Sequence, residues 1–214
     1  REIGYDMREM GARRVLVVTD RRMATLQPVA IAVESLRREG IDAVLYGEAE
    51  IEPTDLSFKE AIRVAHEGRF DGYVGIGGGS SIDTVKAANL YATHPADFLA
   101  YVNAPIGKGA PVPGPLKPMI GIPTTAGTGS ETTGVAIFDL TEMHAKTGIA
   151  HRALRPTVGL VDPNNTRTLP KTVIACSGFD VLSHGIESYT ALPYHQRPAP
   201  EHPGMRPAYQ GSNP

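Results

Sequence analysis

The sequence has almost no cysteine, no excess of basic charge and no long apolar run. The only cysteine in its 214 residues is Cys176, which excludes an internal disulfide framework and indicates a reducing, intracellular compartment. Lys and Arg number 21 against 23 Asp and Glu, so the net charge of −2 argues against a nucleic-acid partner. The strongest apolar run, Val15 to Val18, falls far short of the roughly 20 residues that cross a bilayer, so no membrane partner is expected.

What the chain does contain is an alternation of strand and helix patterns over its first 90 residues. Strands are expected at 14–19, 43–46 and 72–76, and helices at 27–39, 54–68 and 81–90. In the second of these helices, Leu56, Ile62 and Ala65 are expected to point inward. This order predicts an α/β fold with a parallel, Rossmann-like sheet and right-handed crossovers.

The second half of the chain is less regular. Prolines and glycines over 103–123 predict an irregular surface loop that leads into a strand at 119–122. Further strands are expected at 135–138 and 157–161, and a helix at 171–191 that opens with Leu169-Pro170. The tail from Pro193 to Pro214 holds six prolines and no amphipathic period, so we expect a connector to a further part of the protein.

The first candidate motif is the glycine turn, Gly77-Gly78-Gly79-Ser80, followed by Ser81, Ile82 and Asp83. Glycines let backbone N–H groups approach a pyrophosphate, and the helix that follows adds free donors and a positive dipole end. A tight strand-to-helix turn with a serine cap is the alternative. The motif differs from the usual dinucleotide fingerprint and from a Walker A loop.

The second motif is the hydroxyl loop, Thr124 to Glu131, which follows the strand at 119–122. Its hydroxyls and glycines could line a ribose and a phosphate, and a plain Gly/Thr turn is the alternative. It would neighbour the glycine turn if the sheet order brings the two strand ends together.

The third motif is Asp180 and His184, four residues apart in the expected helix and therefore on one face of it. A carboxylate and an imidazole suit Fe²⁺ or Zn²⁺, and Glu187 is also within reach by spacing. Two ligands are not a site, and an Asp–His salt bridge is the alternative. Cys176, one turn earlier, is expected to be a small buried helix residue rather than a nucleophile.

The three motifs occur in a fixed order along the chain: Gly77-Gly78-Gly79-Ser80-x-x-Asp83, then Pro123-Thr124-Thr125-Ala126-Gly127-Thr128-Gly129-Ser130-Glu131, then Gly178-Phe179-Asp180-x-x-x-His184-x-x-Glu187. In this order they resemble the iron-containing (group III) alcohol dehydrogenase family. The stretches 85–91, 104–109 and 206–214 are similar, more narrowly, to the hydroxyacid–oxoacid transhydrogenase branch of that family.

The resemblance implies an NAD-binding α/β domain over 1–168 and the start of a helical metal-binding domain over 169–214. It also implies a cofactor groove, in which Asp20 lies near the adenine ribose and favours NAD because a carboxylate repels a 2′-phosphate. The remaining groove residues implied by the family pattern are Gly78, Gly79, Ser80, Asp83, Thr124, Thr125, Thr128 and Lys146.

The resemblance further implies a hydride transfer between a hydroxy acid such as 4-hydroxybutyrate and an oxo acid such as 2-oxoglutarate. Asp180 and His184 match the first two of four ligands to Fe²⁺ or Zn²⁺. The other two are histidines that lie beyond Pro214 in the family pattern, and His195 and His202 are not at their spacing, so we expect this chain alone to be inactive.

Other functions remain open at this stage. They are an iron-dependent alcohol or polyol dehydrogenase, and a non-catalytic nucleotide-binding fragment. The resemblance leaves a homo-oligomer open, and implies a cytoplasmic protein in a bacterium and a mitochondrial one in an animal.

Overall fold

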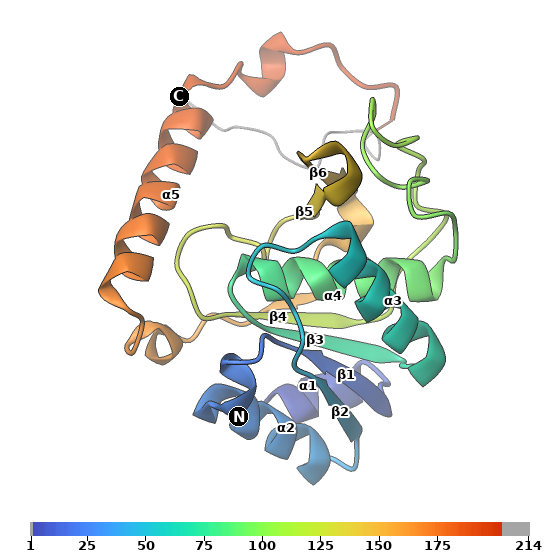
Figure 1. Cartoon of the computed structure of the whole chain (residues 1–214), viewed down its shortest axis with the longest axis vertical. Coiled ribbons are helices and arrows are strands. Elements are labelled where there is room, and N and C mark those ends of the chain that lie inside the picture. Colours follow the sequence, from blue (N-terminus) through green and yellow to red (C-terminus); the bar gives the residue numbers. More distant parts are fainter. Residues whose placement is uncertain (1, 203–214) are drawn as a thin grey trace.

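A five-stranded parallel sheet forms the centre of the computed structural model, which describes residues 2–202 (Figure 1). The strand order is β2-β1-β3-β4-β7. The strands are β1 (Arg14–Val18), β2 (Asp42–Tyr46), β3 (Gly72–Gly77), β4 (Met119–Pro123) and the two-residue β7 (Val158–Gly159). The expected α/β class with a parallel, Rossmann-like sheet is confirmed.

Helices cover both faces of the sheet because alternate residues of β1 point to opposite sides. Val15 and Val17 face α1 and α2, whereas Leu16 and Val18 face α3 and α4. These helices are α1 (Ile3–Glu9), α2 (Gln27–Arg38), α3 (Asp55–Gly68) and α4 (Gly79–Thr93). The result is a three-layer sandwich with the carboxyl ends of the strands at one edge.

A two-stranded antiparallel hairpin packs beside this sandwich. It consists of β5 (Val135–Leu140) and β6 (Ala145–Ala150), and its Phe138 contacts Phe58 of α3 with ring centroids 5.2 Å apart. Short 3₁₀ turns complete the connections: η1 (Met23–Thr25), η2 (Thr141–Met143), η3 (Arg152–Leu154), η4 (Pro163–Thr166) and η5 (Tyr194–Gln196).

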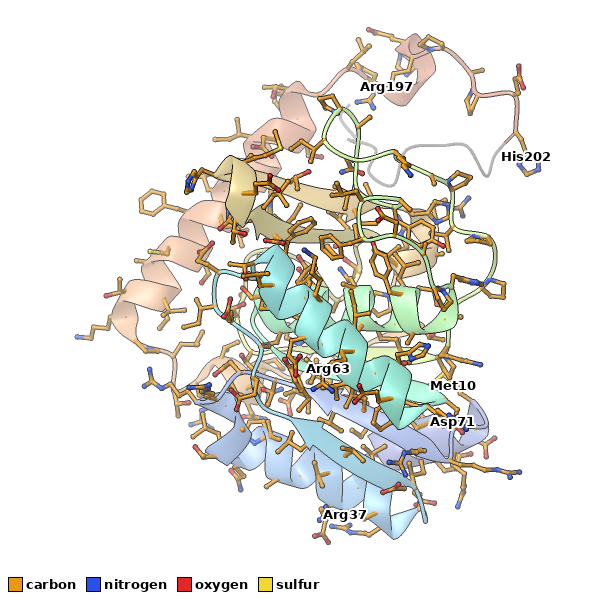
Figure 2. All side chains as sticks on the ribbon, turned by 45° about the vertical axis from the view of Figure 1, so that its right-hand side comes forward. Met10, Arg37, Arg63, Asp71, Arg197 and His202 are labelled. Atoms are coloured by element: carbon orange, nitrogen blue, oxygen red, sulfur yellow. The ribbon has the colours of Figure 1, made fainter. Side chains whose placement is uncertain are left out.

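The last helix, α5 (Lys171–Thr190), stands to one side of the sandwich (Figure 1) and buries none of its residues. Its apolar side chains are about half exposed or more on several sides, as for Ile174, Phe179 and Ile186. The chain that follows it carries Arg197 and His202, at the opposite end of the molecule from Arg37 of α2 (Figure 2). No helix within residues 2–202 has both the length and the apolarity to span a membrane.

The expected strands and helices are present, with two additions and two corrections. The sequence patterns missed α1 and β6. The inward placement of Leu56 was wrong, because this first-turn residue of α3 is 61% exposed, and Cys176 is exposed on α5 rather than buried. The 206–214 stretch lies outside the described residues. The boundary at 168/169 stays a prediction.

Candidate functional site

The glycine turn connects β3 to α4 and needs glycine for two separate reasons. Gly77 has a φ of +148°, a backbone conformation that side-chain-bearing residues rarely adopt, and a Cβ there would lie 2.7 Å from Ser81 Oγ. Gly78 is the N-cap of α4, and its carbonyl accepts the N–H groups of Ser81 and Ile82. The serine cap considered from the sequence is therefore not formed, and the Ser80 hydroxyl instead donates to the carbonyl of Ile51.

The hydroxyl loop lies against the glycine turn because β4 is the direct neighbour of β3. Pro123 pairs with Gly77, and the Thr124 N–H donates to the Gly77 carbonyl at 2.9 Å. A Cβ at Gly79 would lie 2.7 Å from Thr128 Oγ1 and 3.0 Å from Ser130 Oγ. The sheet order therefore makes the glycine turn and the hydroxyl loop neighbours, as expected if their two strand ends lie side by side.

Between the two loops Gly78 has room for a side-chain carbon, which would only touch Thr125. A Cβ at Gly78 would come no closer than 3.8 Å to any neighbouring atom, the nearest belonging to Thr125. Gly78, Gly79, Ser80 and Thr125 are all partly exposed. Free N–H groups at the start of α4, the positive end of its dipole and nearby hydroxyls form an arrangement suited to an anionic group.

Asp20 follows β1 at the same edge of the sheet. Its Oδ1 accepts the N–H groups of Arg22 and Met23 at 2.9 Å each, which caps the turn into η1. Its Oδ2 lies 3.7 Å from where a Cβ at Gly77 would be. The carboxylate therefore caps a turn with one oxygen and directs the other toward the glycine turn.

Asp83 and Lys146 hold positions that spacing alone did not reveal. Asp83 is buried, and its Oδ2 accepts the Ile137 N–H at 3.0 Å. Burial raises the pKa of this carboxyl, and the charge of Lys86 is the main effect that opposes this rise.

Lys146 Nζ bonds to Glu52 at 2.9 Å. The same lysine lines a cavity of about 460 Å³ beside the β5–β6 hairpin, together with Asn103, Ala104, Pro105, Ile106, Ile137, Thr147 and Gly148.

Lys146 is nevertheless linked to the glycine turn through the segment after β2. Glu52, its partner, follows Ile51, whose carbonyl accepts the Ser80 hydroxyl. The side-chain bonds with Glu52, and secondarily with Asp139, raise the pKa of Lys146, so the ammonium stays charged at neutral pH. Lys146 is thus linked to the glycine turn indirectly, through Glu52 and Ile51.

Asp180 reaches the hydroxyl loop from α5, and His184 follows it one turn later on the same helix. Asp180 Oδ2 would lie 2.8 Å from a Cβ at Gly127, so the helix touches the loop at a residue that must be small. Asp180 Oδ1 and His184 Nε2 are 3.8 Å apart, and both side chains are more than a third exposed. Glu187 accepts instead from the Ser183 hydroxyl at 3.4 Å. Among residues 2–202 no three His, Cys, Asp or Glu side chains are grouped as a metal site.

Two residues that the motif search did not single out support the site. Ser130 is buried in the hydroxyl loop, with its Oγ 3.0 Å from Thr128 Oγ1, and Lys86 is fully buried on α4. The sequence signal for Ser130 is its place two residues after Thr128. The signal for Lys86 is its place three residues after Asp83, the spacing at which opposite charges pair on one face of a helix.

Comparison with known proteins identifies similar chains along the whole sequence. The family model described as iron-containing alcohol dehydrogenase matches residues 1–163. A hydroxyacid-oxoacid transhydrogenase, mitochondrial, from Xenopus tropicalis is 60% identical over 215 residues, which cover 100% of this chain and 46% of that protein. The chain therefore spans about half the length of the curated relatives it matches.

Solved structures show the same architecture. An alcohol dehydrogenase from Oenococcus oeni has a TM-score of 0.81 at 30% identity, over 89% of this chain and 49% of that one. A sulfoacetaldehyde reductase from Bifidobacterium kashiwanohense in complex with NAD⁺ has a TM-score of 0.79 at 26% identity, over 88% of this chain and 48% of that one.

Proposed function

The chain belongs to the iron-containing alcohol dehydrogenase family, and we propose its function from this membership and from the geometry of its loops. The proposal is that it forms the NAD-binding half of an oxidoreductase that transfers hydride between a hydroxy acid and an oxo acid. The observation that carries it is the close approach of the hydroxyl loop to the glycine turn at Gly79 and Thr128, beside a partly exposed Gly78 whose nearest neighbour is Thr125.

The residues at this contact fit a dinucleotide. The diphosphate would be held by the backbone of Gly78 and Gly79 and by Ser80, and the free oxygen of Asp20 would face the adenine ribose. Thr124, Thr125 and Thr128 would line the opposite wall, with Lys146 toward the hairpin. Asp83 would support this wall from behind, because its carboxylate bonds within the protein. The NAD⁺ complex of the sulfoacetaldehyde reductase supports NAD as the cofactor.

The names of the relatives support the reaction. The 60% identical frog protein is named a hydroxyacid-oxoacid transhydrogenase, so the substrates proposed here are a hydroxy acid resembling 4-hydroxybutyrate and an oxo acid resembling 2-oxoglutarate. Bound NAD would supply the hydride chemistry, while this chain's loops would bind and orient it. The same relative's name includes mitochondrial, which supports that location.

The metal donors of this chain are incomplete. Asp180 and His184 have the donor chemistry that Fe²⁺ or Zn²⁺ accepts, and we propose them as two of its ligands. Two donors 3.8 Å apart do not make a site, since at least three protein ligands are usual. These two residues alone therefore do not support a metal-dependent catalytic step. The same observation favours a second candidate function, in which this chain by itself binds the nucleotide without catalysis.

Isothermal titration calorimetry of the chain with NAD tests the proposal. Saturable binding is expected, and Thr128→Val should weaken it about tenfold by removing one well-placed hydroxyl. Thr166→Val is the matched control, because its hydroxyl bonds locally to the Pro163 carbonyl on η4 and should leave NAD affinity unchanged. Absence of saturable heat at millimolar NAD would refute NAD binding by this chain.

A further inference from the structure

Lys86 is a buried charge that the proposed function does not use. It lies on α4 one turn after Asp83, its side chain is 0% exposed, and no groove residue other than Asp83 is among its bonding partners. Its Nζ bonds to Asp83 Oδ1 at 3.2 Å, Thr133 Oγ1 at 3.2 Å and the Val135 carbonyl at 2.7 Å. All three protons of the ammonium are thereby used within the protein.

These bonds connect α4 to the segment that leaves the hydroxyl loop. Lys86 holds Thr133 and Val135, while Asp83 holds the Ile137 N–H and lies close enough to Ser130 for that side chain to lower the pKa of Asp83. The pair therefore fixes both the end of the loop and the first residues of β5 onto one helix.

Ser130 transmits this placement to the glycine turn. Its Oγ is 3.0 Å from Thr128 Oγ1, and its N–H donates to the same Thr128 oxygen at 3.2 Å. Both hydroxyls would be within 3.0 Å of a Cβ at Gly79. The turn from Thr128 to Ser130 therefore packs closely against the start of α4, where backbone N–H groups of the helix have no partner within the helix.

We propose that Lys86 is a positioning residue for the diphosphate site, which acts through Asp83 and Ser130 to hold Thr128 beside the glycine turn. The inference rests on the proposed NAD function for its ligand, but the placement of the turn can be measured without any ligand. Burial lowers the pKa of Lys86 and raises that of Asp83, and the charge of each opposes the shift of the other, as expected for a buried ion pair.

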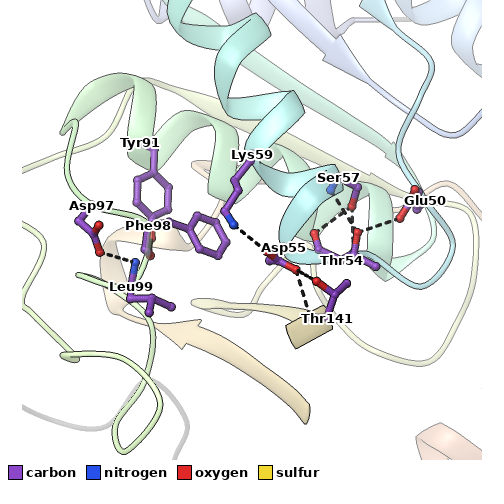
Figure 3. A network of polar contacts seen from close by, with 10 residues as sticks. All are labelled: Glu50, Thr54, Asp55, Ser57, Lys59, Tyr91, Asp97, Phe98, Leu99 and Thr141. Atoms are coloured by element: carbon purple, nitrogen blue, oxygen red, sulfur yellow. Dashed lines mark hydrogen bonds and ion pairs between the residues drawn. The ribbon is translucent and has the colours of Figure 1, made fainter. Parts of the chain in front are cut away.

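The chain offers a matched control in a second helix-to-strand brace (Figure 3). Lys59 of α3 bonds to the buried Asp55 at 2.6 Å, and Asp55 accepts the N–H and the hydroxyl of Thr141 just after β5. This brace pairs the same residue types as Lys86 and Asp83, with a lysine that is 47% exposed rather than buried, and it ties down the other end of β5. Its bonds do not include residues of the glycine turn or the hydroxyl loop.

The experiment compares Lys86→Met with Lys59→Met by ¹⁵N NMR, first without ligand and then in titrations with ADP and adenosine. In Lys86→Met, the amide signals of Gly79 and of Thr128 to Ser130 should shift and exchange faster than in the wild type. ADP affinity should fall about tenfold, whereas adenosine, which lacks phosphate, should bind as in the wild type. Lys59→Met should leave all of these readouts unchanged.

Because Lys86→Met leaves a buried carboxylate without its cation, the double variant Lys86→Met/Asp83→Asn serves as a second test. It should be more stable than the single variant and should keep the same loss of ADP affinity. Full recovery of ADP affinity in the double variant would overturn the positioning role, as would wild-type amide signals and ADP affinity in Lys86→Met.

The outcomes separate this inference from the proposed function. If the wild type binds neither ADP nor NAD, the NAD function fails, while the ligand-free amide signals still report whether Lys86 places the turn. If the wild type binds ADP and both lysine variants lose affinity equally, Lys86 has no special role.

Discussion

At the scale of single residues, the three glycines of the turn are required for different reasons. Gly77 has a positive φ, and Gly79 allows the close approach of Thr128, whereas a Cβ at Gly78 would make only ordinary contacts with Thr125. A motif search sees one run of glycine, but the structure gives a fold reason for Gly77 and Gly79 and none for Gly78, where we propose that the diphosphate approaches.

Substitution with alanine should separate these roles. Gly79→Ala should destabilise the fold by about 1–3 kcal/mol, because the Cβ would overlap Thr128 Oγ1. Gly78→Ala should leave stability nearly unchanged, because its Cβ would make only ordinary contacts with Thr125, but it should weaken NAD binding by holding the diphosphate away from the backbone. Urea unfolding and calorimetry measure the two effects. Gly178→Ala on α5, where nothing lies within 4 Å, is the control for the substitution itself.

If Gly78→Ala binds NAD as tightly as the wild type, the diphosphate does not approach this residue. If Gly79→Ala is as stable as the wild type, the contact with Thr128 is not tight.

His151 provides a pH-dependent contribution to stability. Burial and the neighbouring Arg152 lower the pKa of its imidazole, whose Nδ1 accepts the Ala153 N–H at 3.1 Å. Because the folded pKa lies below the unfolded value of about 6.5, the unfolded state takes up the proton first as the pH falls. The stabilisation is therefore present above that pH and is lost as the pH falls from it toward the folded pKa.

His151→Ser keeps a capping oxygen without a titrating ring, so its unfolding free energy should fall less than that of the wild type between pH 7.5 and 5.5. Equal pH dependence of the two proteins in urea unfolding would contradict this assignment.

At the scale of secondary structure, the sequence predicted elements best where local chemistry and burial agree. The α3 helix begins where Thr54 and Ser57 form a capping box, and its start was predicted within one residue. Leu56 was misplaced because the buried face of α3 runs through Asp55, Phe58, Ala61 and Ala65, and Leu56 lies on the opposite side of the helix from Ala65. The α1 helix is short, and its fit depends on Gly4 packing against the Ser35 backbone, a contact that no local pattern shows.

The candidate site was predictable in its parts but not in its assembly. Each motif could be predicted from its residue types. Their proximity, however, depends on β3 and β4 being neighbours in the sheet, and no short stretch of sequence determines the order of the strands. The burial of Asp83 and the ion pairs of Lys146 also depend on the β5–β6 hairpin, whose second strand was missed because Lys146, Thr147 and Gly148 show no apolar alternation.

The separation of α5 from the sandwich leads to a prediction about truncation. Since α5 buries none of its residues, a chain ending at Thr168 should unfold within a few degrees of the full chain. It should also bind NAD with the same affinity. Thermal unfolding by circular dichroism and calorimetry measure these quantities, and a large loss of stability would show that α5 belongs to the core domain.

At the scale of the whole molecule, the two parts of the candidate site have different supports. The glycine turn and hydroxyl loop are fixed on a buried parallel sheet, whereas Asp180 and His184 belong to a helix that reaches that loop at Gly127. The proposed nucleotide site therefore stands on the core of the fold, whereas the two proposed metal ligands stand on a helix that buries none of its residues.

It follows that this chain should bind NAD but take up Fe²⁺ or Zn²⁺ poorly and show no dehydrogenase turnover. The reason is that residues 2–202 contain no group of three metal-ligating side chains. Metal titration by calorimetry and an absorbance assay for NADH formation test this, with His184→Ala expected to remove the residual metal binding. Metal-dependent turnover by the purified chain would contradict it.

The position of β1 between β2 and β3 has a consequence during synthesis of the protein. Both partners of β1 come later in the sequence, and its Val15 to Val18 are completely enclosed in the finished fold. At translation rates of about 5–20 residues per second, this valine-rich segment leaves the ribosome seconds before β3 is available. The nascent chain therefore carries an unpaired, aggregation-prone strand for that interval, which is a natural site for chaperone capture.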